Sequence, residues 1–84
     1  MEDSIFSVER QIKIRRPARM FKRLNPGARN LYNAQCSLAE GETVVVGPAQ
    51  GMGWNHGVYS AVPFYDDNEE FFLLTSEIDF VVVR

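Results

Sequence analysis

Apolar and polar residues alternate along much of the chain, and a period of two is typical of half-buried β-strands. Residues 31–38 alternate in this way, and the parity that contains Cys36 is expected to face the core. Residues 4–14 predict another strand, in which Arg10 interrupts an apolar parity formed by Phe6, Val8, Ile12 and Ile14. The first half of the chain therefore contains two predicted strands, separated by a segment of different character.

The second half of the chain is rich in β-branched and aromatic residues, which favour strands. Four strands are predicted there, at residues 43–46, 58–65, 71–74 and 78–83. The 71–74 segment is an unbroken apolar run, and we expect it to be buried on both faces or covered by a partner. Pro63 has no N–H to donate, so its end of the strand is expected at a sheet edge or at a bulge.

Residues 15–26 have a different pattern, which favours a helix. Pro17 suits the first helical position, and the sequence Asn-Pro-Gly at residues 25–27 is a stop signal. At 100° per residue, one side of this segment would carry Met20, Phe21 and Leu24, and the opposite side would carry basic residues. The pattern predicts one short helix at residues 17–24, packed on the sheet and exposing a basic ridge.

Residues 47–57 are predicted to form a long glycine-rich loop. The segment holds four of the six glycines, together with the only tryptophan and the only histidine. Eleven residues are more than a tight hairpin needs, and loops longer than their connection requires are often functional. We therefore expect an interaction site on this loop.

The spacing of the predicted elements indicates the fold class. Six candidate strands with turns every eight to twelve residues favour a small barrel or sandwich over alternating strands and helices. The chain of 84 residues is long enough for one domain. We therefore predict a mainly β fold, a small barrel or sandwich of five to six antiparallel strands with one short helix, in a single β-rich domain over residues 1–84.

Composition narrows the expected environment of the protein. A content of 45% hydrophobic and 24% charged residues is ordinary for a soluble globular domain. No apolar run approaches the roughly 20 residues of a membrane span. The first residues are acidic, whereas a signal peptide begins with basic residues. We therefore expect a cytoplasmic or virion protein that is not secreted and has no membrane partner.

The net charge of −2 conceals a strong asymmetry along the chain. Residues 1–30 carry eight Lys or Arg against three acids, a balance of +5, and residues 31–84 carry one Arg against eight acids, a balance of −7. This segregation predicts two charged faces or a head-to-tail fit between subunits. The alternative is that the two halves neutralise each other within one compact fold.

The residue types needed for catalysis or for binding a metal are scarce. Cys36 and His56 are the only thiol and the only imidazole, and neither lies in a metal-ligand spacing. A reactive thiol lies in an exposed, electropositive place, whereas Cys36 is predicted to be in the core. The glycine spacing at residues 47–57 matches no nucleotide-binding motif. We therefore predict no enzymatic activity, no cofactor and no metal.

Two sets of residues are candidate interaction surfaces. Arginine matches phosphate geometry, and aromatic residues between the basic ones could stack on bases. A basic site for nucleic acid or another anionic partner is predicted at Arg15, Arg16, Arg19, Lys22, Arg23 and Arg29. Aromatic residues and methionine anchor protein interfaces when they are exposed. A protein interface is predicted at Met52, Trp54, Asn55, His56 and Tyr59, unless Trp54 folds back to close one end of the fold.

These patterns favour a binding role over a catalytic one. The expected function is a non-enzymatic protein-binding or structural module, a subunit of a larger assembly such as a virion capsid or tail, with a protein partner or self-assembly. One alternative is nucleic-acid binding through the basic segment 15–29, although a pI of about 5.3 is low for such a domain. A second alternative is a small phage-encoded inhibitor.

Overall fold

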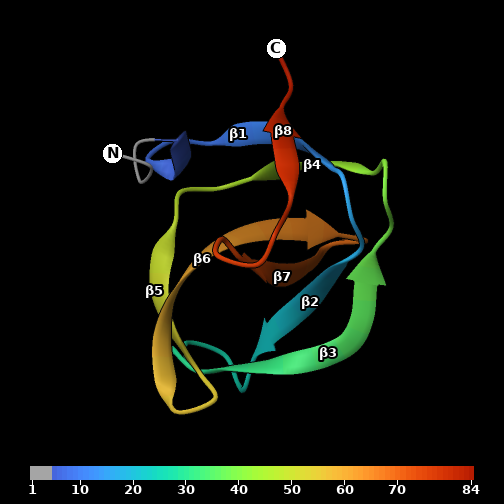
Figure 1. Ribbon diagram of the computed structural model, residues 1–84. Coiled ribbons are helices and arrows are strands. Elements are labelled where there is room, and N and C mark those ends of the chain that lie inside the picture. Colours follow the sequence, from blue (N-terminus) through green and yellow to red (C-terminus); the bar gives the residue numbers. More distant parts are fainter. Residues whose placement is uncertain (1–4) are drawn as a thin grey trace.

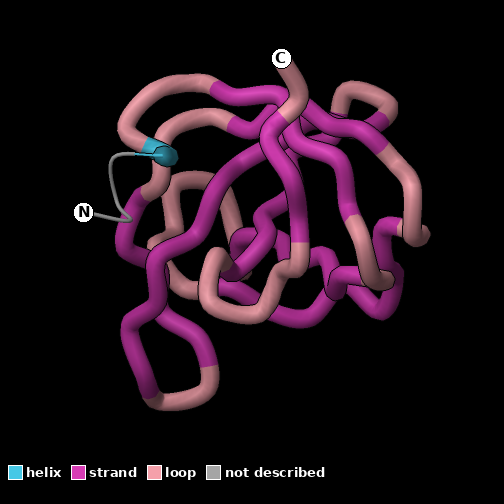
Figure 2. The backbone as a smooth tube through the Cα atoms, turned by 45° about the horizontal axis from the view of Figure 1, so that its top comes forward, coloured by secondary structure: helices cyan, strands magenta, loops and turns pink. Residues whose placement is uncertain are grey.

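A computed structural model of the chain describes residues 5–84, which form β-strands joined by turns (Figure 1). The only helical turn among them covers residues 5–6, which Figure 2 shows in cyan. The strands are β1 (Arg10–Ile14), β2 (Ala18–Arg23), β3 (Leu31–Leu38), β4 (Thr43–Val46), β5 (Gln50–Trp54), β6 (Gly57–Asp66), β7 (Glu69–Leu74) and β8 (Phe80–Val82).

The strands form two antiparallel sheets, one with the order β4-β1-β8 and one with the order β3-β2-β7-β6-β5. The mainly β, sandwich-like fold that the sequence predicts is therefore confirmed. The structure has eight strands, which is more than the predicted five to six, and the two that were not among the six candidate strands are β2 and β5. Both sheets are open, so the sandwich alternative holds rather than the closed barrel.

The first hydrophobic core lies between the two sheets. The three-stranded sheet contributes Ile12, Ile14 and Val46, and the five-stranded sheet packs β6 and β7 side chains against them, including Phe64 and Leu73. All five side chains are almost completely buried. The parity of Ile12 and Ile14 is the one that the sequence predicts to face inward.

A second core occupies the other face of the five-stranded sheet. Its buried members are Phe21, Leu31, Met52, Ala61, Phe72 and Leu74. The sheet curls around this core until its edge strands β3 and β5 approach each other, where Gly53 N–H donates to the Arg29 carbonyl at 2.7 Å. A Cβ on Gly53 would overlap the Asn30 side chain, so a larger residue there would have to displace that side chain. Burial of residues 71–74 on both faces is thereby confirmed.

The helix predicted at residues 17–24 is wrong, because β2 occupies this segment. Ala18 and Met20 contact the first core and Phe21 contacts the second, and the ladder with β3 shifts register between Arg19 and Phe21. Two adjacent buried residues break the period of two that a strand normally shows. Met20, Phe21 and Leu24 therefore mimicked the spacing of a helix face.

The prediction that Cys36 faces the core is also wrong, because its side chain is exposed. Arg19 pairs with Ser37 and Phe21 pairs with Asn33, so β3 contains two more residues than β2 across this interval. Gln35, at the centre of the bulge, has a φ of 63°, and its N–H is bonded to the Asn33 side chain at 2.9 Å. The bulge turns Cys36 away from the sheet packing, and alternation alone does not predict it.

The glycine-rich segment is a hairpin rather than a long loop. β5 pairs with β6 from Gln50 opposite Ala61 to Trp54 opposite Gly57, which leaves a two-residue turn. The two turn residues, Asn55 and His56, have φ values of 49° and 64°, as a type I′ turn requires. The hairpin extends beyond the rest of the fold in Figure 2.

The strand predicted at residues 4–14 is shorter than expected, since β1 begins at Arg10 and residue 4 lies outside the described residues. Phe6 is buried as predicted, but Val8 is exposed. The Arg10 guanidinium donates to the Ile5 carbonyl at 2.7 Å, which accounts for a charged residue on the apolar parity. Pro63 lies where β6 has lost its ladder with β5, as its missing N–H predicts.

Candidate interaction surfaces

The predicted protein interface is only partly exposed. Met52 is buried in the second core and therefore presents no surface to a partner. Trp54 and Tyr59 are half-buried against the same core, and the Trp54 ring packs edge-on against Phe21 with 4.9 Å between centroids. Only Asn55 and His56, at the hairpin turn, are exposed. The alternative in which Trp54 folds back onto the fold therefore describes its position.

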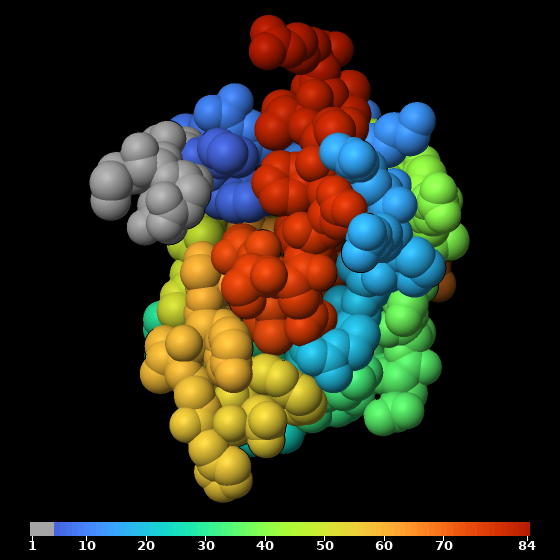
Figure 3. All heavy atoms as spheres, in the orientation of Figure 1, coloured from blue at the N-terminus to red at the C-terminus, as the bar shows by residue number. Residues whose placement is uncertain are grey.

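Two apolar residues that the sequence analysis did not select are exposed beside this turn. Val58 is 83% exposed and Leu24 is 55% exposed, and both line a shallow hollow of about 420 Å³ with Trp54. Figure 3 shows the hairpin, in yellow and orange, at the lower edge of the molecule. We call Leu24, Trp54, Asn55, His56 and Val58 the hairpin patch. The sequence did not indicate that Val58 is exposed, because Val58 lies on the same parity of its strand as Val62, which is buried.

The basic residues of the predicted site contact acidic side chains or backbone carbonyls of the same chain. Arg15 and Arg16 lie 3.6 and 3.4 Å from the Asp79 carboxylate, which is their common partner. Arg19 makes a two-pronged contact with Glu77, at 2.8 and 3.2 Å. In Figure 3 the C-terminal segment, in red, lies directly against the light-blue segment that carries these arginines. Residues 15–19 and residues 77–79 are thus joined by opposite charges.

The remaining basic residues of the set also have partners. Lys22 binds Glu69 at 2.7 Å, and Arg23 binds Glu70 at 2.8 Å as well as the Ala28 carbonyl at 2.7 Å. Arg29 donates to the Gly51 carbonyl at 3.1 Å. All six cations therefore have an oxygen partner, and five of them pair with acids of the second half of the chain.

The ion pairs change the acid–base properties of two groups. The hydrogen bond to Glu77 raises the pKa of Arg19 above its ordinary value, although partial burial opposes the shift. The hydrogen bond to Glu69 raises the pKa of Lys22 in the same way. The Arg19 guanidinium also lies 5.3 Å from the centre of the Phe21 ring and 5.8 Å from that of Trp54. Both groups remain cationic at neutral pH and are held by these contacts.

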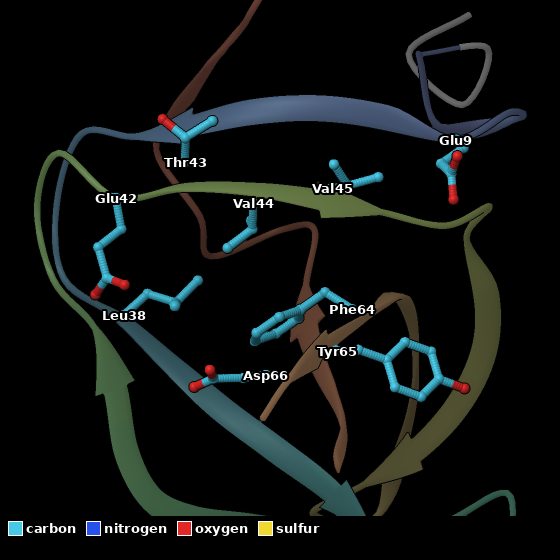
Figure 4. A pocket seen from close by; sticks show the side chains of 9 residues that line it. All are labelled: Glu9, Leu38, Glu42, Thr43, Val44, Val45, Phe64, Tyr65 and Asp66. Carbon is cyan, nitrogen blue, oxygen red and sulfur yellow. The ribbon is translucent and has the colours of Figure 1, made fainter. Parts of the chain in front are cut away.

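A groove between β4 and the end of β6 is a third surface, and the sequence analysis did not predict it. Its volume is about 470 Å³, and Leu38, Val44 and Phe64 supply apolar side chains to it (Figure 4). We call it the β4–β6 groove. Its remaining lining residues are Glu9, Glu42, Thr43, Val45, Tyr65 and Asp66. The strand pairing creates this groove, because residues 42–45 and 64–66 meet only in the folded chain.

Within residues 5–84, no group of three or more His, Cys, Asp or Glu side chains is arranged to hold a metal ion. Cys36 lies on β3, and His56 lies at the turn between β5 and β6. The described part of the chain also lacks any helix with the length and apolarity needed to cross a membrane. Comparison with protein-family models, with curated proteins and with solved structures yields no match for this chain.

Proposed function

We propose that this chain is a non-enzymatic structural module that associates with copies of itself through the hairpin patch, as a subunit of a larger assembly. The observation that carries the proposal is the exposure of Val58 and Leu24 around a common hollow on a projecting hairpin. Burying one such side chain fully stabilises a complex by roughly 1.5–3 kcal/mol. A virion capsid or tail component is the kind of assembly that we propose.

The charge pattern of the hairpin patch supports self-association. Its five residues include no carboxylate, lysine or arginine, and His56 is its only titratable side chain. Two copies can therefore approach through this surface without repulsion between like charges. The β5–β6 ladder closes the turn that carries Asn55 and His56, and such ordering before binding lowers the entropy cost of association.

Light scattering during size-exclusion chromatography, over a range of protein concentrations, tests the proposal. We expect a mass above that of one chain, which falls to the mass of one chain when Val58→Lys and Leu24→Lys are introduced together. Val82→Lys, on the exposed edge strand β8, is the matched control and is expected to keep the wild-type mass. A single-chain mass at every concentration, or equal masses for all variants, would contradict the proposal.

Nucleic-acid binding through residues 15–29 is the weaker proposal. Phosphate contacts require cations that can exchange their present counterions for the phosphate backbone. Five of the six cations instead pair with carboxylates of the same chain, and Arg29 contacts a backbone carbonyl. Phosphates would compete with these contacts for the same cations.

A further inference from the structure

The edge strand β4 directs backbone groups away from its own sheet. Its only ladder partner among residues 5–84 is β1. The Ile14 N–H donates to the Glu42 carbonyl at 2.8 Å, so Ile14 and Glu42 form a hydrogen-bonded pair of the antiparallel ladder. Every second residue of β4 from Glu42 onward therefore directs its backbone groups toward β1. Val44 therefore turns its N–H and C=O toward β1, and Val45 turns them to the opposite side. An open strand edge of this kind is a template for another strand.

The outward side of β4 is the side that faces β6. Gly47, which has the same phase as Val45, donates its N–H to the Pro63 carbonyl at 2.7 Å. Beyond this bond the ladder of β6 continues only with β7, where Phe64 is paired with Phe71. A two-residue turn follows Asp66, so Asp66 and Glu69 form the hydrogen-bonded pair that closes it. The neighbouring residue Tyr65 therefore turns its N–H and C=O away from β7. The β4–β6 groove thus lies between two open strand edges.

The side chains of the groove define the chemistry of a ligand. Val44 and Phe64 point toward each other across it in Figure 4, and they form its apolar floor. Tyr65 and Val45 flank it with exposed fractions of 70% and 52%. All the charged side chains that line it are carboxylates, and these belong to Glu9, Glu42 and Asp66. The groove therefore complements an extended segment that carries both apolar and positively charged side chains.

We propose that the β4–β6 groove binds an extended lysine- or arginine-containing segment of a partner protein, which adds as a strand to the edge of β4. Strand addition of this type obtains affinity from backbone hydrogen bonds and specificity from alternate side chains. The bound segment bonds to the N–H and C=O of Val45. Its apolar side chains lie on Val44 and Phe64, and its cationic side chains face Glu9 and Asp66.

A second copy of this chain is a poorer occupant of the groove than a basic peptide. Edge-to-edge pairing of two β4 strands would bring two sets of the same carboxylates, those of Glu9 and Glu42, close to one interface. Like charges brought together in this way oppose association. The site is also separate from the hairpin patch, so it does not depend on self-association of the chain.

Titration of the protein with two six-residue peptides tests the site. One peptide alternates lysine and valine, and the other alternates glutamate and valine. We expect the lysine peptide to bind and the glutamate peptide not to bind. Amide hydrogen exchange of the wild-type protein should slow at Val45 when the lysine peptide is added and remain unchanged at Val82 of the other edge strand. Equal binding of both peptides, no binding of either, or unchanged exchange at Val45 would overturn the proposal.

Matched variants test the backbone and charge contributions separately. Val45→Pro removes the outward N–H without removing a ladder bond, and we expect it to weaken peptide binding about tenfold. Val82→Pro removes the corresponding outward N–H of β8 and should leave binding unchanged. Glu9→Gln and Asp66→Asn are each expected to weaken binding about threefold, whereas Glu40→Gln, outside the groove, should not. If the peptide binds but no groove variant weakens its binding, the site lies elsewhere on the protein. If the protein forms a dimer that Val45→Pro abolishes, a second copy of the chain and not a peptide occupies the groove.

Discussion

The Trp54 ring links the sheet to the hairpin patch. One side of the ring packs against Phe21, and the Arg19 guanidinium lies 5.8 Å from its centre. The rest of the ring lines the hollow beside Val58. Trp54 therefore has two roles that a substitution cannot separate, and for this reason the self-association test uses Val58 and Leu24 instead.

Replacing Trp54 with Ala is expected to lower the free energy of unfolding by about 2–3 kcal/mol. The ring is half-buried, and full removal of a buried Trp or Phe side chain costs about 3–5 kcal/mol. Urea unfolding followed by circular dichroism measures the change. Val58→Ala, at the highly exposed neighbouring position, should stay within about 0.5 kcal/mol of the wild type. Superimposable curves for Trp54→Ala and the wild type would mean that the ring adds nothing to the core.

The burial of a single residue could be predicted from the sequence only where its strand alternates regularly. The inward parity of Ile12 and Ile14 was predictable, because β1 follows a regular alternation. The exposure of Cys36 was not, because it depends on a bulge that only the pairing of β3 with β2 creates. Burial of Met52 likewise depends on the curl of the five-stranded sheet, which no local pattern encodes.

At the scale of elements, strands with a regular alternation or an unbroken apolar run were predictable, and β2, which has neither pattern, was not. β2 lies between β3 and β7 and contributes Met20 to one core and Phe21 to the other. The resulting pattern resembles a helix. β5 was missed for another reason: it contains Gly51 and Gly53, and glycine is depleted in strands. The close approach at Gly53, which explains that glycine, involves residues distant in the sequence.

The β5–β6 turn offers a test at this scale, because its second residue has an unfavourable backbone conformation. His56 has a φ of 64°, which costs a residue with a side chain more than it costs glycine. Asn-Gly is the preferred sequence for this type I′ turn. We expect His56→Gly to raise the free energy of unfolding by about 0.5–1 kcal/mol, measured by urea unfolding.

Asn68→Gly is the matched control for His56→Gly. Asn68 occupies the second position of the β6–β7 turn with a φ of 66°, so the same substitution relieves a similar conformation there. Asparagine adopts positive φ more readily than histidine does, so a smaller gain is expected at residue 68. A loss of stability with His56→Gly would show that the imidazole makes a stabilising contact at the turn.

At the scale of the whole molecule, the charge asymmetry of the sequence is resolved by folding. Acids of β7 and of the segment before β8 pair with the basic residues on and before β2, at Arg15, Arg16, Arg19, Lys22 and Arg23. Neutralisation within one fold is the alternative to two charged faces or to a head-to-tail fit between subunits. Sequence alone could not select it, because the choice depends on β2 lying next to β7.

These ion pairs lead to an expectation about nucleic acid. If carboxylates of the same chain occupy the cations, the wild-type protein should bind a single-stranded oligonucleotide only weakly. Replacing Glu69, Glu70 and Glu77 with Gln frees Lys22, Arg23 and Arg19 from their ion pairs and raises the net charge by three units, because three carboxylates are removed. The triple variant should therefore bind the oligonucleotide more tightly, with an affinity that falls steeply as salt is raised.

Fluorescence anisotropy at several salt concentrations measures this difference, and the slope of the logarithm of affinity against that of salt reports the number of phosphate contacts. The slope for a single strand is about −0.7 per phosphate contact, so three freed cations should steepen it by about 2. The control is Glu40→Gln, which removes one carboxylate that lies outside these ion pairs. Tight, salt-sensitive binding by the wild type, lost when Arg19, Lys22 and Arg23 are replaced with Gln, would instead make residues 15–29 a nucleic-acid site. Weak binding and tight, salt-sensitive binding by the wild type are opposite results, so this measurement decides between ion pairing within the chain and a nucleic-acid site at residues 15–29.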